Sequence, residues 1–340
     1  MGPSEYAIPP GGWVLVTGAN GYIASHIVDI LLQLGYNVRG TVRQEKPWLD
    51  RFFEDKYGKG RYESIVVPAM EEEDAFASAA KGMNGIIHVA TDLSLTSDPH
   101  KVIPAVRAGL INALKAASSQ ESVKRFVLTS SSTAAIIPEP NKKGVVVDEN
   151  TWNDDTVALA WSGKAPESAQ GYTTYAASKT EAERAAWKWV EENKPGFVLN
   201  TILPNCNFGR ILIPEHMHGS TMGFVRNFFK GNYSALGLLP PQYFVDVRDT
   251  ARLHVAALLD PNVKAERIFA FATEYNWTDV LHILRKLRPN QEFPDDPENE
   301  GRDYSKVVPI ARAQKLLKDF FGQESWISIE DSLADGIEDL

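Results

Sequence analysis

The sequence predicts an α/β fold in which a doubly wound parallel sheet carries a smaller, interwoven lobe. Over the first two hundred residues, short apolar runs alternate with longer helical patterns. This alternation is typical of a parallel sheet with helices on both faces, as in Rossmann-type domains. After Pro204 the chain becomes rich in Gly, Pro, Asn and aromatic residues, and it then returns to a helix and a strand.

Each predicted element follows from its apolar pattern. The expected strands are Trp13–Thr17, Asn37–Val42, Ser64–Val67, Gly85–Ala90, Arg125–Ser130, Leu199–Leu203 and Arg267–Ala272. The expected helices are Tyr22–Leu34, Glu72–Ala80, Pro104–Ser118, Tyr175–Glu192, Met222–Lys230, Asp246–Leu259, Trp277–Leu287 and Ile310–Phe321. We therefore expect a dinucleotide-binding domain over residues 1–204, rejoined by 246–273, and a substrate-binding lobe from 205–245 and 274–340.

A glycine turn follows the first strand and opens the first helix. The segment reads Val-Thr17-Gly18-Ala-Asn20-Gly21-Tyr-Ile-Ala24. Gly18 permits the tight turn, Gly21 allows a pyrophosphate to approach the helix N-terminus, and Ala24 is small enough for helix to pack on strand. In this context the pattern favours dinucleotide binding over an ordinary strand–helix turn.

The end of the second strand indicates which dinucleotide is bound. Units that bind NAD usually place an acid there, on the ribose hydroxyls. Here the strand ends at Arg43, which suits the 2′-phosphate of NADP, and Lys46 adds positive charge. Glu45 opposes this interpretation if its side chain points inward. A solvated surface arginine is the alternative for Arg43.

Tyr175 and Lys179 are the candidate proton donor and its partner. Their four-residue spacing places both side chains on one helix face. A cation beside a phenol lowers the phenol pKa, which makes a better acid for protonating a carbonyl oxygen. The strand ending in Thr129-Ser-Ser131-Ser132 supplies hydroxyls at the same sheet edge, with Ser131 our choice and Ser130 and Ser132 as alternatives.

Composition excludes several classes of protein. The net charge of −9 disfavours non-specific binding to nucleic acid or anionic membranes. The lone Cys206 excludes an internal disulfide and a cysteine-rich metal site, and we expect no metal. The sequence has no 18-residue apolar run, and residues 1–13 lack a signal-peptide pattern. We expect a cytoplasmic protein, either a monomer or a homodimer.

Together these motifs resemble those of the extended short-chain dehydrogenase/reductase family. The matching positions are Thr17-Gly18 to Ala24, Ser131, and Tyr175 with Lys179, and the likeness extends over nearly the whole chain. The chain is most similar to yeast NADPH-dependent carbonyl or aldehyde reductases and to plant dihydroflavonol and cinnamoyl-CoA reductases. In one departure, Ala69 stands where relatives usually have an Asp that binds the adenine amine.

The resemblance implies NADPH-dependent reduction of a small-molecule carbonyl compound. Aldehydes and ketones, including ketoesters and aryl ketones, would become alcohols, with Tyr175 as proton donor, Ser131 on the oxygen and Lys179 on the ribose. The expected NADP-binding residues are Thr17, Gly18, Asn20, Gly21, Tyr22, Ile23, Arg43, Lys46, Met70, Ala90, Thr91, Thr129, Tyr175, Lys179, Pro204 and Asn207. The expected substrate-binding residues are Leu93, Phe208, Met222, Phe224, Pro241 and Gln242.

Two other functions remain open on the sequence. A sugar-nucleotide epimerase or dehydratase of the same family would use the same Tyr175 and Lys179, although such enzymes typically keep NAD bound and Arg43 argues against NAD. A non-catalytic NADP sensor is the second alternative. Sensors of this fold often lack the tyrosine, whereas this chain has Ser131, Tyr175 and Lys179.

Overall fold

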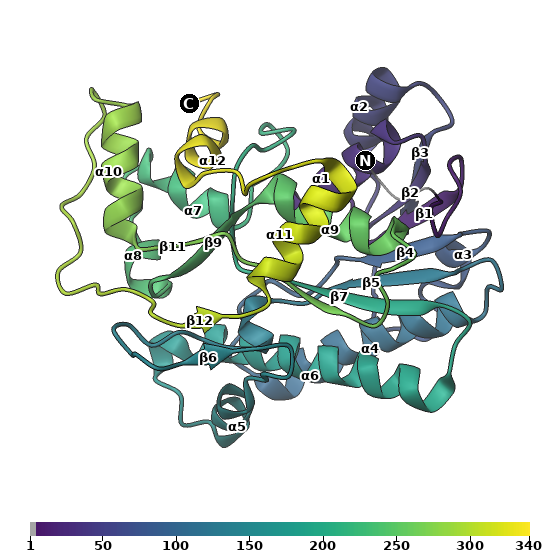
Figure 1. The fold of residues 1–340 in the computed structure, drawn as a ribbon, viewed down its shortest axis with the longest axis horizontal. Coiled ribbons are helices and arrows are strands. Elements are labelled where there is room, and N and C mark those ends of the chain that lie inside the picture. Colours follow the sequence, from purple (N-terminus) through teal and green to yellow (C-terminus); the bar gives the residue numbers. More distant parts are fainter. Residues whose placement is uncertain (1–4) are drawn as a thin grey trace.

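A seven-stranded parallel sheet forms the centre of the computed structural model, which describes residues 5–340 (Figure 1). Its strand order is β10-β7-β5-β4-β1-β2-β3. The strands are β1 (Trp13–Val16), β2 (Asn37–Val42), β3 (Tyr62–Val66), β4 (Gly85–His88), β5 (Arg125–Thr129), β7 (Val198–Pro204) and β10 (Arg267–Ala270). Every neighbouring pair is parallel, which confirms the predicted doubly wound α/β fold.

Helices cover both faces of this sheet. One face carries α1 (Tyr22–Gln33), α2 (Pro47–Tyr57), α9 (Val247–Leu259) and α11 (Ile310–Phe321). The other carries α3 (Ala77–Ala80), α4 (Pro99–Ser118) and α6 (Gln170–Asn193), with α5 (Asp154–Ser162) against α6. In Figure 1, α4 and α6 lie on the opposite side of the strands from α1, α9 and α11.

The core divides into two parts because successive strand residues face opposite ways. Val14 and Val16 of β1 pack in the cluster beneath α1 and α9, whereas Leu15 between them packs in the cluster beneath α4 and α6. In β5, Val127 packs in the cluster beneath α1 and α9, whereas Phe126 packs in the cluster beneath α4 and α6. Both faces of the central strands β1, β4 and β5 are therefore buried, as is typical of a parallel sheet, whereas the edge strand β3 is partly exposed.

The remaining elements form a smaller region at the carboxyl ends of the strands. It contains β8 (Cys206–Phe208), β9 (Gln242–Asp246) and β11 (Thr273–Tyr275) in one sheet, with α7 (Thr221–Phe228), α8 (Ala235–Leu238), α10 (Trp277–Leu287) and α12 (Ile329–Gly336). A parallel pair, β6 (Val146–Val147) and β12 (Lys306–Val307), links distant loops. Short 3₁₀ helices occupy Ser132–Ala134 and Glu167–Ala169.

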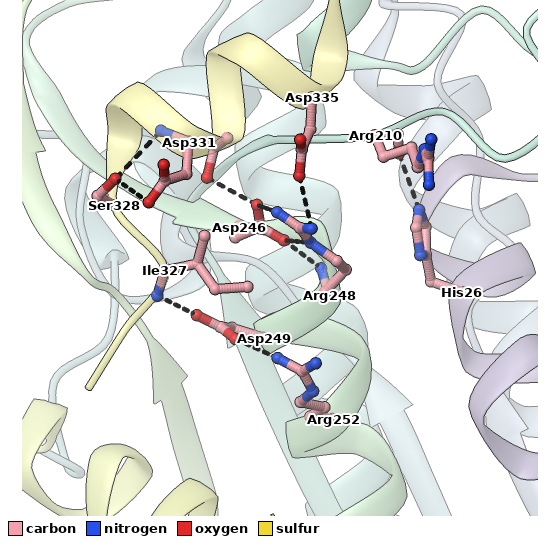
Figure 2. A network of polar contacts seen from close by, with 12 residues as sticks. His26, Arg210, Asp246, Arg248, Asp249, Arg252, Ile327, Ser328, Asp331 and Asp335 are labelled. Atoms are coloured by element: carbon pink, nitrogen blue, oxygen red, sulfur yellow. Dashed lines mark hydrogen bonds and ion pairs between the residues drawn. The ribbon is translucent and has the colours of Figure 1, made fainter. Parts of the chain in front are cut away.

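A polar network fastens α12 to the start of α9 (Figure 2). The fully buried Asp246 caps α9 and accepts a hydrogen bond from the Ser332 hydroxyl at 2.7 Å. Arg248 joins Asp246 at 2.8 Å and Asp335 at 2.6 Å, so it bridges the two helices. Asp249, also fully buried, accepts from the Ile327 amide at 2.9 Å. The charges are paired, as burial demands.

Three helices differ from their predicted bounds by more than two residues, and one of them, α6, begins at Gln170, five residues before the predicted start. The expected helix Glu72–Ala80 is reduced to Ala77–Ala80, because Asp74 takes a left-handed conformation with φ 57° and the Asn112 side chain binds the carbonyls of Met70 and Glu72. Helix α4 begins at Pro99, five residues before the predicted start, because the Asp98 carboxylate caps it and a proline at the first position needs no amide partner.

None of the helices within residues 5–340 is long and apolar enough to cross a bilayer. Across the same residues, no group of three or more His, Cys, Asp or Glu side chains is arranged to hold a metal ion.

Candidate active site

A cavity of about 650 Å³ lies across the carboxyl ends of β1, β2, β4, β5 and β7. Strand order reverses between β1 and β4, and open α/β sheets bind their ligands beyond the strand ends at such a point. The volume is in the range of small-molecule and cofactor sites. Loops after these strands and segments of the smaller lobe supply the walls.

The glycine turn forms the floor of the cavity. Gly18 has φ +67°, a left-handed conformation, and a β-carbon there would meet the Ala90 β-carbon at 3.2 Å. Gly21 is the N-cap of α1, with no side-chain cap and no acid in the first turn. The amides and the positive end of α1 are therefore available to an anion. Asn20, Gly21, Tyr22 and Ile23 line the cavity.

Thr17 does not line the cavity, although the sequence places it among the cofactor residues. Its side chain is fully buried, and its hydroxyl oxygen accepts hydrogen bonds from the Val89 and Ala90 amides at 2.9 and 3.0 Å. It also contacts His88 Nδ1 at 3.2 Å. Thr17 thus joins the ends of β1 and β4 and holds Ala90 against Gly18.

Arg43 and Lys46 lie at the rim of the cavity beyond β2. Arg43 is exposed and has no ion pair or side-chain hydrogen bond with another described residue. By contrast, Arg39 on the same strand is engaged by Glu63 at 2.6 Å. Glu45 does not line the cavity. A guanidinium is therefore available where the 2′-phosphate of NADP would lie, and no carboxylate from this strand opposes it.

Met70 lines the cavity beside Val67, where the adenine would lie. Its carbonyl accepts from Asn112 of α4 at 3.1 Å, which fixes the turn. Ala69 is absent from the lining, so Met70 and Val67 give this part of the cavity an apolar surface.

The end of β5 carries the hydroxyl cluster into the cavity. Thr129 and Ser130 to Ser132 all line it. The Ser131 oxygen accepts two hydrogen bonds from Thr133, from the amide at 3.2 Å and from the hydroxyl at 2.9 Å. Because both bonds use its lone pairs, the Ser131 proton remains available for donation to a ligand oxygen.

Helix α6 brings Tyr175 and Lys179 to the same place. Both line the cavity, and Tyr175 stacks on Tyr172 with ring centroids 6.4 Å apart. Lys179 is buried, and its Nζ donates to the Thr129 carbonyl at 2.7 Å. The structure therefore brings Ser131, Tyr175 and Lys179 together at one end of the cavity.

The acidity of Tyr175 differs from the sequence expectation. Burial raises the pKa of the Tyr175 phenol, and contact with the Ser131 hydroxyl partly offsets this effect. The Lys179 ammonium donates to the Thr129 carbonyl at 2.7 Å. Burial lowers the pKa of Lys179 itself to about 8. In the protein alone, Tyr175 is thus a protonated donor rather than a tyrosinate.

Pro204 and Asn207 line the far wall. The Asn207 side chain is held inside the protein, with its Nδ2 on the Asn205 carbonyl at 2.9 Å and its Oδ1 on the Thr250 hydroxyl at 2.6 Å. Cys206 also lines the cavity, and burial raises the pKa of its thiol to about 12. The thiol is therefore uncharged.

The predicted substrate-binding residues fall into two groups, those that line the cavity and those that do not. Leu93 and Gln242 line the cavity, whereas Phe208, Met222, Phe224 and Pro241 do not. Phe208 is fully buried against Tyr275, with ring centroids 5.2 Å apart, and Met222 is fully buried beneath Gly336. Phe224 is partly buried against the same core, and Pro241 is buried before β9.

The neighbours of these residues in sequence line the cavity instead. Asn207 stands beside Phe208, Thr221 beside Met222, and Gln242 beside Pro241. Adjacent residues of a strand face opposite ways, and adjacent residues of a helix such as α7 also point in different directions, so the hydrophobic member of each pair enters the core. Other lining residues that the sequence reasoning missed are Thr41, Val42, Gln44, Val89, Thr133, Tyr172, Asn205, Ser220 and Leu239. Gln44, Asn205 and Ser220 are polar residues in irregular segments, which no periodic pattern reveals.

The cavity fits a phosphorylated dinucleotide. It combines the close approach at Gly18, an uncapped helix N-terminus, and the unpaired Arg43 at the rim. It also contains the buried Thr91 hydroxyl, which has no partner within residues 5–340. A buried polar group of this kind points to a ligand that completes its hydrogen bonding.

Comparison with known proteins agrees with this geometry. The sequence profile described as the NAD dependent epimerase/dehydratase family matches residues 14–271. The chain is 47% identical to ketoreductase adrE of Penicillium rubens, over 98% of each chain. It is 42% identical to aldehyde reductase 2 of Sporidiobolus salmonicolor, over 96% of each. The structure of yeast methylglyoxal/isovaleraldehyde reductase Gre2 complexed with NADPH is similar, with a TM-score of 0.77, 25% identity and coverage of 96% of this chain and 97% of that chain.

Proposed function

The chain belongs to the NAD-dependent epimerase/dehydratase family of extended short-chain dehydrogenases/reductases, and we propose that it is an NADPH-dependent carbonyl reductase with Tyr175 as proton donor. The family membership confirms the resemblance inferred from the motifs. One structural observation supports this function more specifically than family membership alone. Ser131, Tyr175 and Lys179 converge at one end of a cavity whose other end offers Arg43.

Bound NADPH supplies a hydride for the carbonyl carbon. Tyr175 gives its phenolic proton to the carbonyl oxygen, so that the carbonyl compound, the hydride and one proton become an alcohol. Ser131 donates a hydrogen bond to the same oxygen as negative charge develops there. Because burial raises the pKa of Tyr175, the proton stays on the phenol until that oxygen becomes basic.

Lys179 and Arg43 hold opposite ends of the cofactor in this proposal. The Lys179 ammonium lies beside Tyr175 at the base of the cavity and binds the ribose hydroxyls nearest the reacting carbon. Arg43 binds the 2′-phosphate at the rim, where Lys46 adds a second cation. A planar guanidinium suits a phosphate better than a ribose hydroxyl pair, and the resulting preference is for NADPH.

Residues 205–245 and 274–340 form the substrate-binding lobe in this proposal. Cys206, Thr221, Leu239 and Gln242 extend the cavity beyond Tyr175. Their mixture of polar and apolar groups favours a carbonyl compound that carries a second polar group, such as a ketoester, over a plain hydrocarbon ketone.

The test is NADPH oxidation by the purified protein with a panel of aldehydes, aryl ketones and ketoesters, followed by absorbance. Formation of the alcohol in step with NADPH loss supports the proposal. If NADPH binds and no carbonyl compound is reduced, the sensor alternative replaces it. If the purified protein carries NAD that survives dialysis, the epimerase alternative does.

A further inference from the structure

Glu183 is a fully buried carboxylate that the proposed chemistry does not use. It lies on α6, one turn beyond Lys179 and two turns beyond Tyr175, and none of its surface is exposed. Burying a charged carboxylate is costly unless it is paired and hydrogen-bonded. The hydrogen bonds and the ion pair of Glu183 offset the free-energy cost of burying its charge.

Three consecutive residues at the end of β5 meet successive turns of α6. The Thr129 carbonyl accepts from Lys179 Nζ at 2.7 Å. The Ser130 hydroxyl donates to Glu183 Oε2 at 2.7 Å. The Ser131 hydroxyl contacts the Tyr175 phenol. Three contacts therefore join the end of β5 to α6. The contact between Glu183 and Ser130 lies beside the two contacts made by Lys179 and Tyr175.

The Glu183 carboxylate also binds two further strands. The Thr201 hydroxyl of β7 donates to Oε1 at 2.8 Å. Arg267 of β10 donates from Nε to Oε1 at 2.8 Å, and this guanidinium is itself nearly buried. Three neighbouring strands, β5, β7 and β10, are thus joined to α6 through one carboxylate.

We propose that Glu183 is a positioning residue that holds the Ser130–Ser131 turn against α6 and keeps the Lys179 ammonium charged beside Tyr175. This inference rests on the proposed reductase function, which it deepens. A carboxylate suits the role because it accepts from every donor around it. The amide of a glutamine would direct one N–H₂ group at those donors.

The titratable groups that interact with Lys179 come from β4, α9 and α6. His88 of β4 and His254 of α9 are uncharged at neutral pH, because burial lowers their pKa to about 3 and about 4. Arg267 of β10 is paired with Glu183. Glu183 is the charged group whose field favours the Lys179 ammonium, against the burial that lowers the pKa of Lys179 to about 8.

The deciding measurement is the pKa of Lys179 in the full chain, followed by NMR of labelled lysine side chains and assigned with Lys179→Met. In Glu183→Gln we expect that pKa to fall by about one unit, because the favourable field is lost. The control Asp249→Asn removes another fully buried carboxylate, which binds Ile327 and Gln323 and no residue of the Glu183 network, and it should leave the Lys179 pKa unchanged. An unchanged Lys179 pKa in Glu183→Gln would overturn the proposal.

Should Glu183→Gln fail to fold, Arg267→Gln provides a second variant for the same measurement. It frees the carboxylate from its ion pair, so the Lys179 pKa should rise, and no rise would contradict the proposal. Neither titration needs turnover. A protein that reduces no carbonyl therefore refutes the proposed function and still leaves the role of Glu183 decided.

Kinetics of an active protein provide the other readout. In Ser130→Ala, which keeps the carboxylate, kcat should fall about 10- to 100-fold with little change in KM for the carbonyl compound, since misplacement affects the transition state more than binding. The fall of kcat with rising pH should follow the Lys179 pKa and move to lower pH in Glu183→Gln. Full kcat in Ser130→Ala would exclude the link through Ser130.

Discussion

At the scale of single residues, the hydroxyl groups of Ser131 and Tyr175 divide the task of handling the carbonyl oxygen. Ser131 accepts two hydrogen bonds from Thr133, so its proton points to the cavity. Tyr175 is kept protonated by burial. One group therefore binds the oxygen throughout, while the other gives its proton up.

Replacing Tyr175 by Phe should separate binding from chemistry. The ring and its stacking on Tyr172 remain, so the Kd for NADPH, measured by fluorescence, should stay within about twofold of the unaltered protein. Turnover should fall about 100- to 10,000-fold because the proton donor is lost. Near-normal turnover in this variant would remove Tyr175 from the mechanism.

Replacing Arg43 by Ala should abolish the discrimination between the two nicotinamide cofactors. The 2′-phosphate loses a charge-assisted hydrogen bond worth about 1.5–3 kcal/mol, which corresponds to a loss of about 10- to 150-fold in kcat/KM for NADPH. The value for NADH should change little. Arg39→Ala on the same strand is the matched control, because Arg39 is occupied by Glu63 outside the cavity. Equal use of both cofactors by the unaltered protein would refute the role of Arg43.

Sequence reasoning at this scale located residues within motifs better than residues in irregular segments. Gly18, Arg43 and Tyr175 belong to strand–turn or helix patterns and line the cavity. Phe208 and Met222 were chosen for hydrophobicity and are buried in the core, while their polar neighbours Asn207 and Thr221 line the cavity. The direction of a side chain in a short strand depends on tertiary packing, which one sequence does not display.

At the scale of elements, residues 209–220 form a strap between the smaller lobe and the cofactor side of the cavity. His216 stacks on Trp48 of α2 with ring centroids 4.6 Å apart. The Gly209 and Arg210 carbonyls are held by Tyr22 and His26 of α1, at 2.7 and 2.8 Å. The strap therefore rests on the two helices that follow β1 and β2.

Removing the Trp48 ring should speed cofactor release. An aromatic pair contributes about 0.5–1.5 kcal/mol, so the dissociation rate of NADPH in Trp48→Ala should rise about 2- to 10-fold, measured by stopped-flow fluorescence. In Trp48→Phe a ring remains for His216 to stack on, so the dissociation rate of NADPH should stay close to that of the unaltered protein. Identical rates in all three proteins would mean that the strap does not restrain the cofactor.

Most elements of the central sheet could be predicted because their apolar runs have the right length and spacing. The short strands β8, β9 and β11 were not predicted as strands, nor were α2, α5 and α12 predicted as helices. In α2, only Leu49 and Phe53 are fully buried among charged residues, so its apolar pattern is thin. These elements exist because of contacts made across the chain rather than through local periodicity.

At the scale of the whole molecule, buried uncharged histidines link stability to pH. Burial lowers the pKa of His88 to about 3 and that of His254 to about 4. The unfolded chain takes up these protons near pH 6.5, whereas the folded protein does not. Folding stability contributed by each histidine is therefore full above pH 6.5 and is lost as the pH falls toward its folded value, at about 1.4 kcal/mol per pH unit.

Urea unfolding between pH 7 and pH 5 measures this loss. His254→Gln keeps an acceptor for the Thr129 hydroxyl and should lose less free energy of unfolding on acidification than the unaltered protein. His282→Gln is the control, because His282 lies at the surface with its side chain 59% exposed. If His254→Gln loses stability as steeply as the unaltered protein, His254 is not the titrating group.

The fastening of α12 to α9 has a consequence for how the protein is made. Asp246, Arg248 and Asp249 are synthesised some eighty residues before Ser332 and Asp335, which complete their hydrogen bonds and ion pairs. Until that later segment has left the ribosome, Asp246 and Asp249 have only the arginines of their own helix, Arg248 and Arg252, as charged partners. The parallel sheet can assemble early from the emerging chain, but the start of α9 gains its full set of hydrogen bonds only with the last turns of the chain.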